Sequence, residues 1–137
     1  MRLESRSIVL ETESDIRIAR SEVRRLATAI GFRLVDQTRL ATVTSELARN
    51  VVKYGGGGIL IAQPTEESDG RGGLRLIFED NGDGIADIEE AMRDGFSTGN
   101  GLGKGLPGSK RLVDEFRIES RPGLGTSVTV VHWLDGN

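Results

Sequence analysis

The sequence predicts an α/β fold, a two-layer sandwich in which helices cover one face of a mixed, mostly antiparallel sheet. Two long segments near the N-terminus carry apolar residues at helical steps of three and four. Most of the remaining chain consists of short strand-like runs, some of them joined by polar, glycine-containing loops. Because strands and helices do not alternate regularly, this order favours a two-layer sandwich over a Rossmann fold.

Two helices are expected in the first half of the chain. The first has its apolar residues at helical spacing over 16–30, and Gly31 is expected to end it. The second is expected to begin at Asp36, a suitable N-cap residue, and to continue to Tyr54. The glycine run 55–58 then ends it.

Five short runs are predicted to be strands because they are rich in apolar and β-branched residues, several of them in alternation with polar ones. They lie at 7–10, 59–62, 74–79, 117–120 and 127–133. The polar stretch 64–73 is expected to be a hairpin loop, and two further helices are expected at 88–92 and 106–115.

Composition excludes several classes of protein. With 137 residues the chain is expected to form one domain, residues 1–137, around a single core. Its net charge of −3 argues against general nucleic-acid binding, and no apolar run approaches the roughly 20 residues that span a bilayer. Cysteine is absent, which excludes disulfides and thiolate metal sites. The N-terminus lacks the apolar core of a signal peptide, so a cytoplasmic protein is expected.

The second predicted helix carries Glu46 and Asn50, four residues apart and therefore on one helix face. They lie on the flank of the apolar stripe, where side chains can overlook a cleft at the edge of the core. An amide oxygen is a hard neutral ligand suited to Mg²⁺, and a neighbouring carboxylate can accept a proton from an attacking hydroxyl. A solvated pair on a helix surface is the alternative, because this spacing is common.

The third predicted strand ends in Asp80, followed by Asn81-Gly82-Asp83-Gly84. Strand alternation points Asp80 to the buried face, where a carboxylate needs a partner such as the exocyclic amine of adenine. Gly82 and Gly84 would let the backbone turn sharply and approach a flat base closely. A plain turn is the alternative, since Asn-Gly and Asp-Gly favour turns.

A glycine-rich loop precedes the predicted helix at 106–115. Gly101, Gly103 and Gly105 would leave backbone N–H groups free to face phosphate oxygens, with a helix N-terminus behind them. Lys104 would add a cation there, although a solvent-facing lysine is the alternative. No Walker A motif is present. Each element alone is weak evidence, but all three in this order indicate a nucleotide site.

The order of these motifs resembles that of the GHKL ATPases of the Bergerat fold, and specifically the small bacterial anti-sigma-factor kinases. The resemblance covers about residues 5–134. Within that branch, the segments 94–98 and 101–116 are most similar to the switch kinases of the stressosome. The resemblance implies a serine/threonine protein kinase that uses Mg-ATP to phosphorylate STAS-domain antagonist or scaffold proteins in a partner-switching stress response.

By the same resemblance, roles can be carried over to individual residues. Asn50 would hold Mg²⁺, Glu46 would be the general base and Asp80 would recognise adenine. The glycines at 82 and 84 would shape the adenine pocket, Thr126 with its preceding glycine would close the far side of the base, and the segment 101–105 would form a lid facing the phosphates.

Other members of the superfamily fit less well. The single histidine, His132, lies on a predicted terminal strand, and no heptad-patterned helix precedes the domain, so a histidine kinase is not expected. Two alternatives stay open: an anti-sigma factor that binds a sigma subunit directly, and a nucleotide-gated binding module without catalysis. A PP2C-type phosphatase is a further candidate partner, and the oligomeric state is not predicted.

The first predicted helix is rich in arginine, at positions 17, 20, 24 and 25. These side chains are interpreted either as a solvated helix face or as a docking surface for an acidic partner. Arg49, next to Asn50, is a candidate contact for a partner or for phosphate. For the four arginines the solvated face is the favoured interpretation, while the role of Arg49 stays open.

Overall fold

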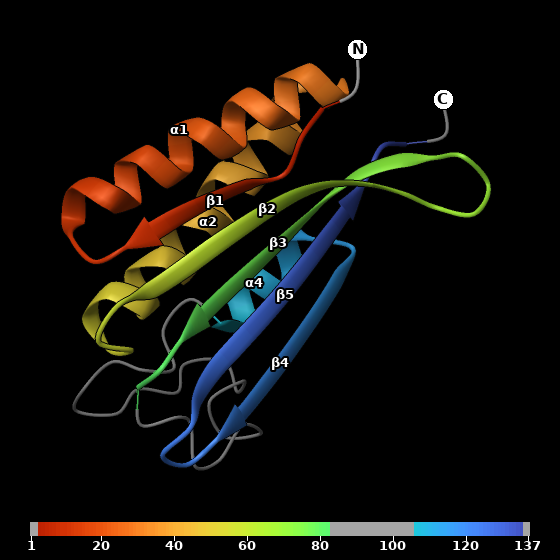
Figure 1. Ribbon diagram of the computed structural model, residues 1–137. Helices are drawn as coiled ribbons and strands as arrows, with labels where there is room; N and C mark the ends of the chain where they lie inside the picture. The colour runs from red at the N-terminus through yellow and green to blue at the C-terminus, as the bar shows by residue number, and fades with distance from the viewer. Residues whose placement is uncertain (1–2, 83–105, 136–137) are drawn as a thin grey trace.

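The computed structural model describes residues 3–82 and 106–135, drawn as coloured ribbon in Figure 1. Two long helices follow the first strand and precede the remaining strands. In chain order the elements are β1 (Arg6–Leu10), α1 (Glu13–Ile30), α2 (Leu34–Lys53), β2 (Gly58–Glu66), β3 (Gly72–Asp80), α4 (Leu106–Leu112), β4 (Glu115–Arg121) and β5 (Gly125–Trp133).

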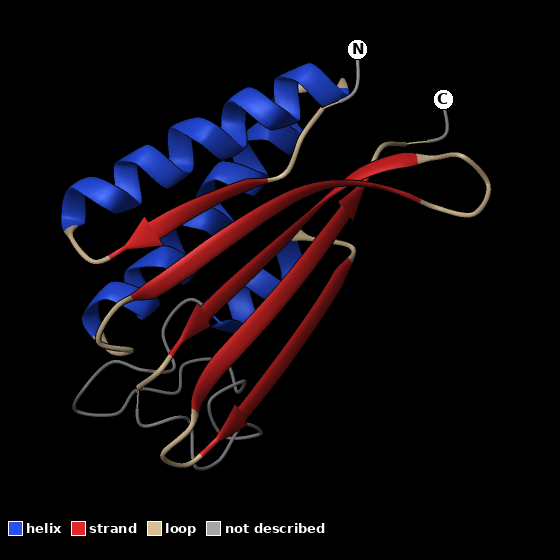
Figure 2. Ribbon diagram, viewed as in Figure 1, coloured by secondary structure: helices blue, strands red, loops and turns tan. Residues whose placement is uncertain are grey.

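The five strands form one sheet in the order β1-β2-β3-β5-β4. The helices gather on one face of this sheet, as Figure 2 shows, so the predicted two-layer α/β sandwich is confirmed. Every pairing among the described strands is antiparallel. The sheet is therefore fully antiparallel among the described strands, whereas the sequence predicted a mixed, mostly antiparallel sheet.

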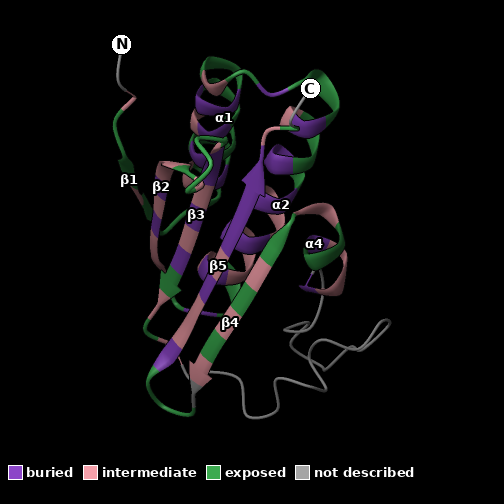
Figure 3. Ribbon diagram, turned by 90° about the vertical axis from the view of Figure 1, so that its right-hand side faces the viewer, coloured by how far each residue is buried: buried purple, intermediate pink, exposed green. Residues whose placement is uncertain are grey.

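The core lies between the sheet and the helices, where buried residues concentrate in Figure 3. Alternation along β3 places Leu74, Leu76 and Phe78 on this inner face, and each is at most 1% exposed. From the other layer, α1 and α2 contribute apolar stripes at helical spacing, including Val23 and Leu47. The inner face of the sheet and the apolar stripe of α2 are buried against each other. This packing fixes the position of α2, the helix that carries two of the candidate site residues.

The ends of α1 follow the local rules expected from sequence. At its N-terminus, Thr12 accepts a hydrogen bond from the backbone N–H of Asp15, and the carboxylate of Asp15 bonds back to the N–H of Thr12, which is a capping box. Gly31 ends the helix in the left-handed region at φ 111°, as predicted.

Three predicted boundaries are wrong. Asp36 is not the N-cap of α2, because the helix begins at Leu34 and Arg33 holds the N-cap position without a side-chain bond. The loop between β2 and β3 is shorter than 64–73, since β2 continues to Glu66 and β3 begins at Gly72. β1 pairs only up to Ala62 of β2, so Pro64 lies where β2 has one free edge and proline is tolerated. The helix expected at 106–115 ends at Leu112.

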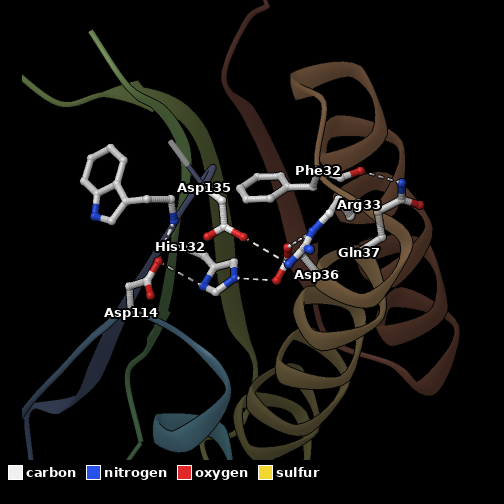
Figure 4. A network of polar contacts seen from close by, with 8 residues as sticks. Phe32, Arg33, Asp36, Gln37, Asp114, His132 and Asp135 are labelled. Atoms are coloured by element: carbon white, nitrogen blue, oxygen red, sulfur yellow. Dashed lines mark hydrogen bonds and ion pairs between the residues drawn. The ribbon is translucent and has the colours of Figure 1, made fainter. Parts of the chain in front are cut away.

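Asp36 instead belongs to a buried polar network with His132 of β5, shown in Figure 4. The Nε2 atom of His132 lies 3.0 Å from Oδ1 of Asp36, and its Nδ1 atom lies 3.3 Å from Oδ2 of Asp114. The second contact lacks hydrogen-bond geometry. Arg33 bridges Asp36 and Asp135, at 3.6 Å and 3.0 Å. The ring of His132 therefore joins the start of α2 to the corner between α4 and β4.

Replacing His132 by alanine is expected to lower the free energy of unfolding by about 3 kcal/mol, because the buried carboxylate of Asp36 loses its shortest partner. Urea denaturation of the single variants and of the double variant with Asp36→Ala measures this coupling. The double variant is expected to be less destabilised than the sum of the two single variants. Strict additivity would contradict the pairing.

Candidate functional site

The fourth and fifth turns of α2 carry Glu46 and Asn50, as the helical pattern predicts. The side chain of Glu46 is 40% exposed, and its Oε1 atom lies 3.5 Å from Nη1 of Arg49. The side chain of Asn50 is half-buried and has no hydrogen-bond partner among the described residues. Its backbone carbonyl accepts from the N–H groups of Tyr54, at 2.9 Å, and Gly55, at 3.0 Å. The amide of Asn50 is thus available to a ligand near the end of the helix.

Asp80 ends β3 on the inner face of the sheet, in step with the buried residues before it, as the alternation predicts. Its Oδ1 atom accepts two backbone N–H groups, from Gly82 at 2.9 Å and from Thr126 at 3.2 Å. Oδ2 receives no hydrogen bond from any described residue. The carboxylate is therefore fixed through one oxygen and presents the other.

Burial raises the pKa of Asp80 above its ordinary value, and the hydrogen bonds from Gly82 and Thr126 oppose this rise. Because burial is the larger effect, the groups around Asp80 stabilise its ionised carboxylate less well than water does. A ligand that donates a hydrogen bond to Oδ2 would supply the missing interaction.

Three glycines bring separate segments into contact around Asp80. A Cβ atom on Gly55 would lie 2.6 Å from the Cβ and Cγ atoms of Asp80, and one on Gly82 would lie 2.9 Å from the Cα of Gly55. Gly125 has φ +94°, and a Cβ atom there would collide with the carbonyl oxygen of Asp80. The end of α2, the end of β3 and the start of β5 can meet only because these positions lack side chains.

Gly55 is the site residue that the sequence analysis missed. It was interpreted only as the first of the glycines that end the second helix. Its N–H donates to the backbone carbonyl of Asn50 at 3.0 Å, while its Cα faces Asp80, so it links the two predicted halves of the site. The run of four glycines was the only available signal, and it did not reveal which glycine faces Asp80.

Beside Asp80 a cavity of about 520 Å³ opens between the ends of β3 and β5 and the β4–β5 turn. Asp80, Thr126, Ser120 and Leu124 are among its lining residues. The structure thus brings together three predicted residues, Asp80, Gly82 and Thr126, and connects them to Asn50 through Gly55. Glu46 does not line this cavity, and instead faces a groove between α1 and α2.

The remaining predicted site residues lie outside the described part of the chain. They are Gly84, Gly101, Gly103, Lys104 and Gly105, together with the helix expected at 88–92. The described chain resumes at Leu106, the first residue of α4, which is buried at 2% exposure.

Residues 35–136 match the family model of histidine kinase-, DNA gyrase B- and HSP90-like ATPases. Because this match covers most of the chain, the protein belongs to that ATPase family. Its membership confirms the resemblance inferred from the motifs and implies that the chain binds ATP.

The chain is also similar to two individual proteins. The chain is 49% identical to serine/threonine-protein kinase RsbT of Bacillus subtilis (strain 168) over 123 residues, which cover 90% of this chain and 92% of that protein. It is 32% identical to the anti-sigma F factor of Halalkalibacterium halodurans over 101 residues, or 68% of this chain and 66% of the relative. The first similarity confirms the predicted enzyme class, a protein serine/threonine kinase.

Two solved structures share the fold. One contains the RsbU and RsbW domains of a Mycobacterium tuberculosis protein, with a TM-score of 0.63 and 23% identity. That match covers 95% of this chain but only 32% of the other polypeptide. The mycobacterial sensor histidine kinase MprB gives a TM-score of 0.56 at 18% identity, with 93% of this chain and 96% of that chain covered. At such identities these similarities support the architecture alone.

The described residues fit a nucleotide at this site. Among the described residues, Oδ2 of Asp80 has no hydrogen-bond donor and the amide of Asn50 has no partner. The exocyclic amine of adenine would supply the first and a magnesium ion the second. Among the described residues there is no cluster of three acidic or histidine side chains of the kind that holds a metal by itself. No helix in the described ranges is long and apolar enough to cross a membrane.

Proposed function

We propose that this chain, as one kinase domain spanning residues 1–137, transfers the γ-phosphoryl group of Mg-ATP to a serine or threonine of a STAS-domain protein. The acceptor would be an antagonist or scaffold protein of a bacterial partner-switching stress response in the cytoplasm. The proposal is carried by one observation, the meeting of Asp80 with the end of α2 just after Asn50. The 49% identity to a serine/threonine kinase supports the reaction type.

In this proposal each candidate residue has one task. Oδ2 of Asp80 accepts a hydrogen bond from the adenine amine, while Gly82 and Gly84 let the backbone lie against the base and Thr126 closes its far side. The amide oxygen of Asn50 would hold Mg²⁺, which would neutralise charge on the nucleotide phosphates. The backbone N–H groups of 101–105, with Lys104, face the phosphates.

Glu46 is the proposed general base. It lies one helical turn before Asn50, so a hydroxyl directed to the nucleotide phosphates from the α1–α2 side would pass near its carboxylate. The carboxylate would take the proton of the acceptor hydroxyl as its oxygen attacks the γ-phosphorus, while the bond to the bridging oxygen breaks and ADP leaves. Arg49, 3.5 Å away, holds this carboxylate in place before the acceptor arrives.

The experiment that tests the proposal is transfer of labelled phosphate. The purified chain is incubated with γ-labelled ATP, Mg²⁺ and a STAS-domain protein from the same genome, and label is expected on a serine or threonine of that protein. Label confined to inorganic phosphate, or no turnover although ATP binds, would contradict the proposal and favour a nucleotide-gated binding module.

A second function is favoured by the 32% identity to an anti-sigma factor. In that case the chain would hold a sigma subunit directly and phosphorylate its own antagonist. Pull-down with purified sigma factor and with a PP2C-type phosphatase distinguishes the two. Retention of the phosphatase alone supports the switch-kinase role, and retention of sigma factor supports the anti-sigma role.

A further inference from the structure

Two grooves on the helical layer form one continuous surface. The first, of about 640 Å³, lies between α1 and α2, and Glu46 is among its lining residues. The second, also of about 640 Å³, lies between the start of α2 and Leu112 of α4. Both grooves are lined by Thr38 and Thr42, so they meet along α2. We call them together the α2 groove.

The α2 groove is strongly basic in a chain of net charge −3. Arg20, Arg24 and Arg49 line its first part, and Arg39 lines its second part. Only Arg49 has an acidic partner within the described ranges, which is Glu46. Arg20, Arg24 and Arg39 are exposed and have no ion pair with any described residue.

The other two arginines of α1 differ from Arg20 and Arg24 because each has a side-chain partner. Arg25 is paired with Glu22 at 2.6 Å, and Arg17 donates to the hydroxyl of Ser14. The sequence had grouped these arginines with Arg20 and Arg24 as one solvated or docking face. The structure separates them, because Arg20 and Arg24, which have no ion pair with any described residue, line the α2 groove, while Arg17 and Arg25 line a different hollow beside it.

The second part of the α2 groove is apolar. Leu34 and Val35, adjacent residues at the start of α2, are 69% and 49% exposed, and they border the groove with Leu112. Two large apolar side chains side by side at a helix start are costly to leave in water. Their position beside unpaired arginines indicates a protein surface with both acidic and apolar residues as the occupant.

We infer that the α2 groove is the docking surface for the phospho-acceptor protein, whose acidic segment lies along Arg20, Arg24 and Arg39 while an apolar side chain contacts Leu34, Val35 and Leu112. This inference rests on the proposed function. Docking there brings the acceptor to Glu46 from outside the nucleotide cavity. The α2 groove shares no lining residue with the cavity beside Asp80, so the acceptor and the nucleotide can be bound at once.

The docking surface is tested by binding, separately from catalysis. The affinity of the STAS-domain protein used in the transfer assay is measured by calorimetry for the wild type and for Arg24→Glu. The dissociation constant is expected to rise about tenfold, because an unpaired groove cation becomes an anion facing acidic residues. Raising the salt concentration is expected to weaken binding of the wild type more than binding of Arg24→Glu.

Arg75→Glu is the matched control. It makes the same charge change on β3, at a position that alternates with buried Leu74 and Leu76 and so faces away from the helices. This control is expected to bind the acceptor as the wild type does. A second variant, Leu34→Ala, is expected to weaken binding severalfold through the apolar part of the groove. Both groove variants should bind a fluorescent ATP analogue normally.

The outcomes distinguish a failure of the docking surface from a failure of the proposed function. Equal affinities for Arg24→Glu and Arg75→Glu would overturn the docking surface, even where the wild type transfers phosphate. Absence of transfer by the wild type would contradict the proposed function, whatever the affinities. A STAS-domain protein that binds the wild type no better than it binds Arg24→Glu also overturns the inference.

Discussion

Replacing Asn50 by alanine is expected to abolish phosphoryl transfer, with a fall in rate of about a thousandfold or more. The described structure gives the Asn50 amide no protein partner, so the variant removes a ligand without breaking an internal bond. A metal at transferring phosphates contributes several kcal/mol of charge stabilisation, and each 1.4 kcal/mol is a factor of about ten in rate. The fold should be unaffected, because the backbone bonds that end α2 do not involve the side chain.

The measurement is single-turnover transfer to the STAS-domain acceptor across a range of Mg²⁺ concentrations. Glu46→Gln serves as the contrast, because it keeps the shape of the side chain and removes the proposed base. Glu46→Gln is expected to lose transfer while it retains nucleotide affinity and the Mg²⁺ dependence of that affinity. Transfer by Asn50→Ala with a normal Mg²⁺ dependence would refute the metal role of Asn50.

Local periodicity predicted those features of the site that depend on a single helix or a single strand. Glu46 and Asn50 share a face because a helix places residues four apart together, and Asp80 points inward because strands alternate. Gly31 ended the first helix as expected, since a left-handed residue is required there. Each of these features needs only short stretches of chain.

Features that depend on distant segments were not predicted. Asp36 was interpreted as a local helix cap, but its partner His132 is 96 residues further along the chain. Gly55 was interpreted as a helix end, although its contact with Asp80 explains why it must be glycine. The sequence likewise could not distinguish Arg24 from Arg25, because only the packing of α1 on α2 determines which one enters the groove.

Asp80→Asn is expected to reduce ATP affinity about a hundredfold, since hydrogen bonds to a charged acceptor contribute about 1.5–3 kcal/mol. Asparagine can keep an oxygen at the position of Oδ1 for the N–H groups of Gly82 and Thr126. Its amino group then replaces Oδ2 and faces the adenine amine, so two donors oppose each other. Titration with fluorescent ATP and GTP analogues measures the loss, which should be larger for the adenine nucleotide. An unchanged ATP affinity would exclude adenine recognition by Asp80.

The same substitution should not destabilise the protein without nucleotide, which separates a binding role from a structural one. Burial raises the pKa of Asp80, so the folded chain binds the proton more tightly than the unfolded chain does. Stability linked to Asp80 therefore increases as pH falls through the raised pKa, and at neutral pH its ionisation costs free energy. Asp80→Asn removes that cost, and its melting temperature at pH 7 should equal or exceed that of the wild type. Since the wild-type carboxylate becomes protonated in acid, the advantage of the variant should shrink towards pH 4; an advantage that grows instead would show that the charge of Asp80 stabilises the fold.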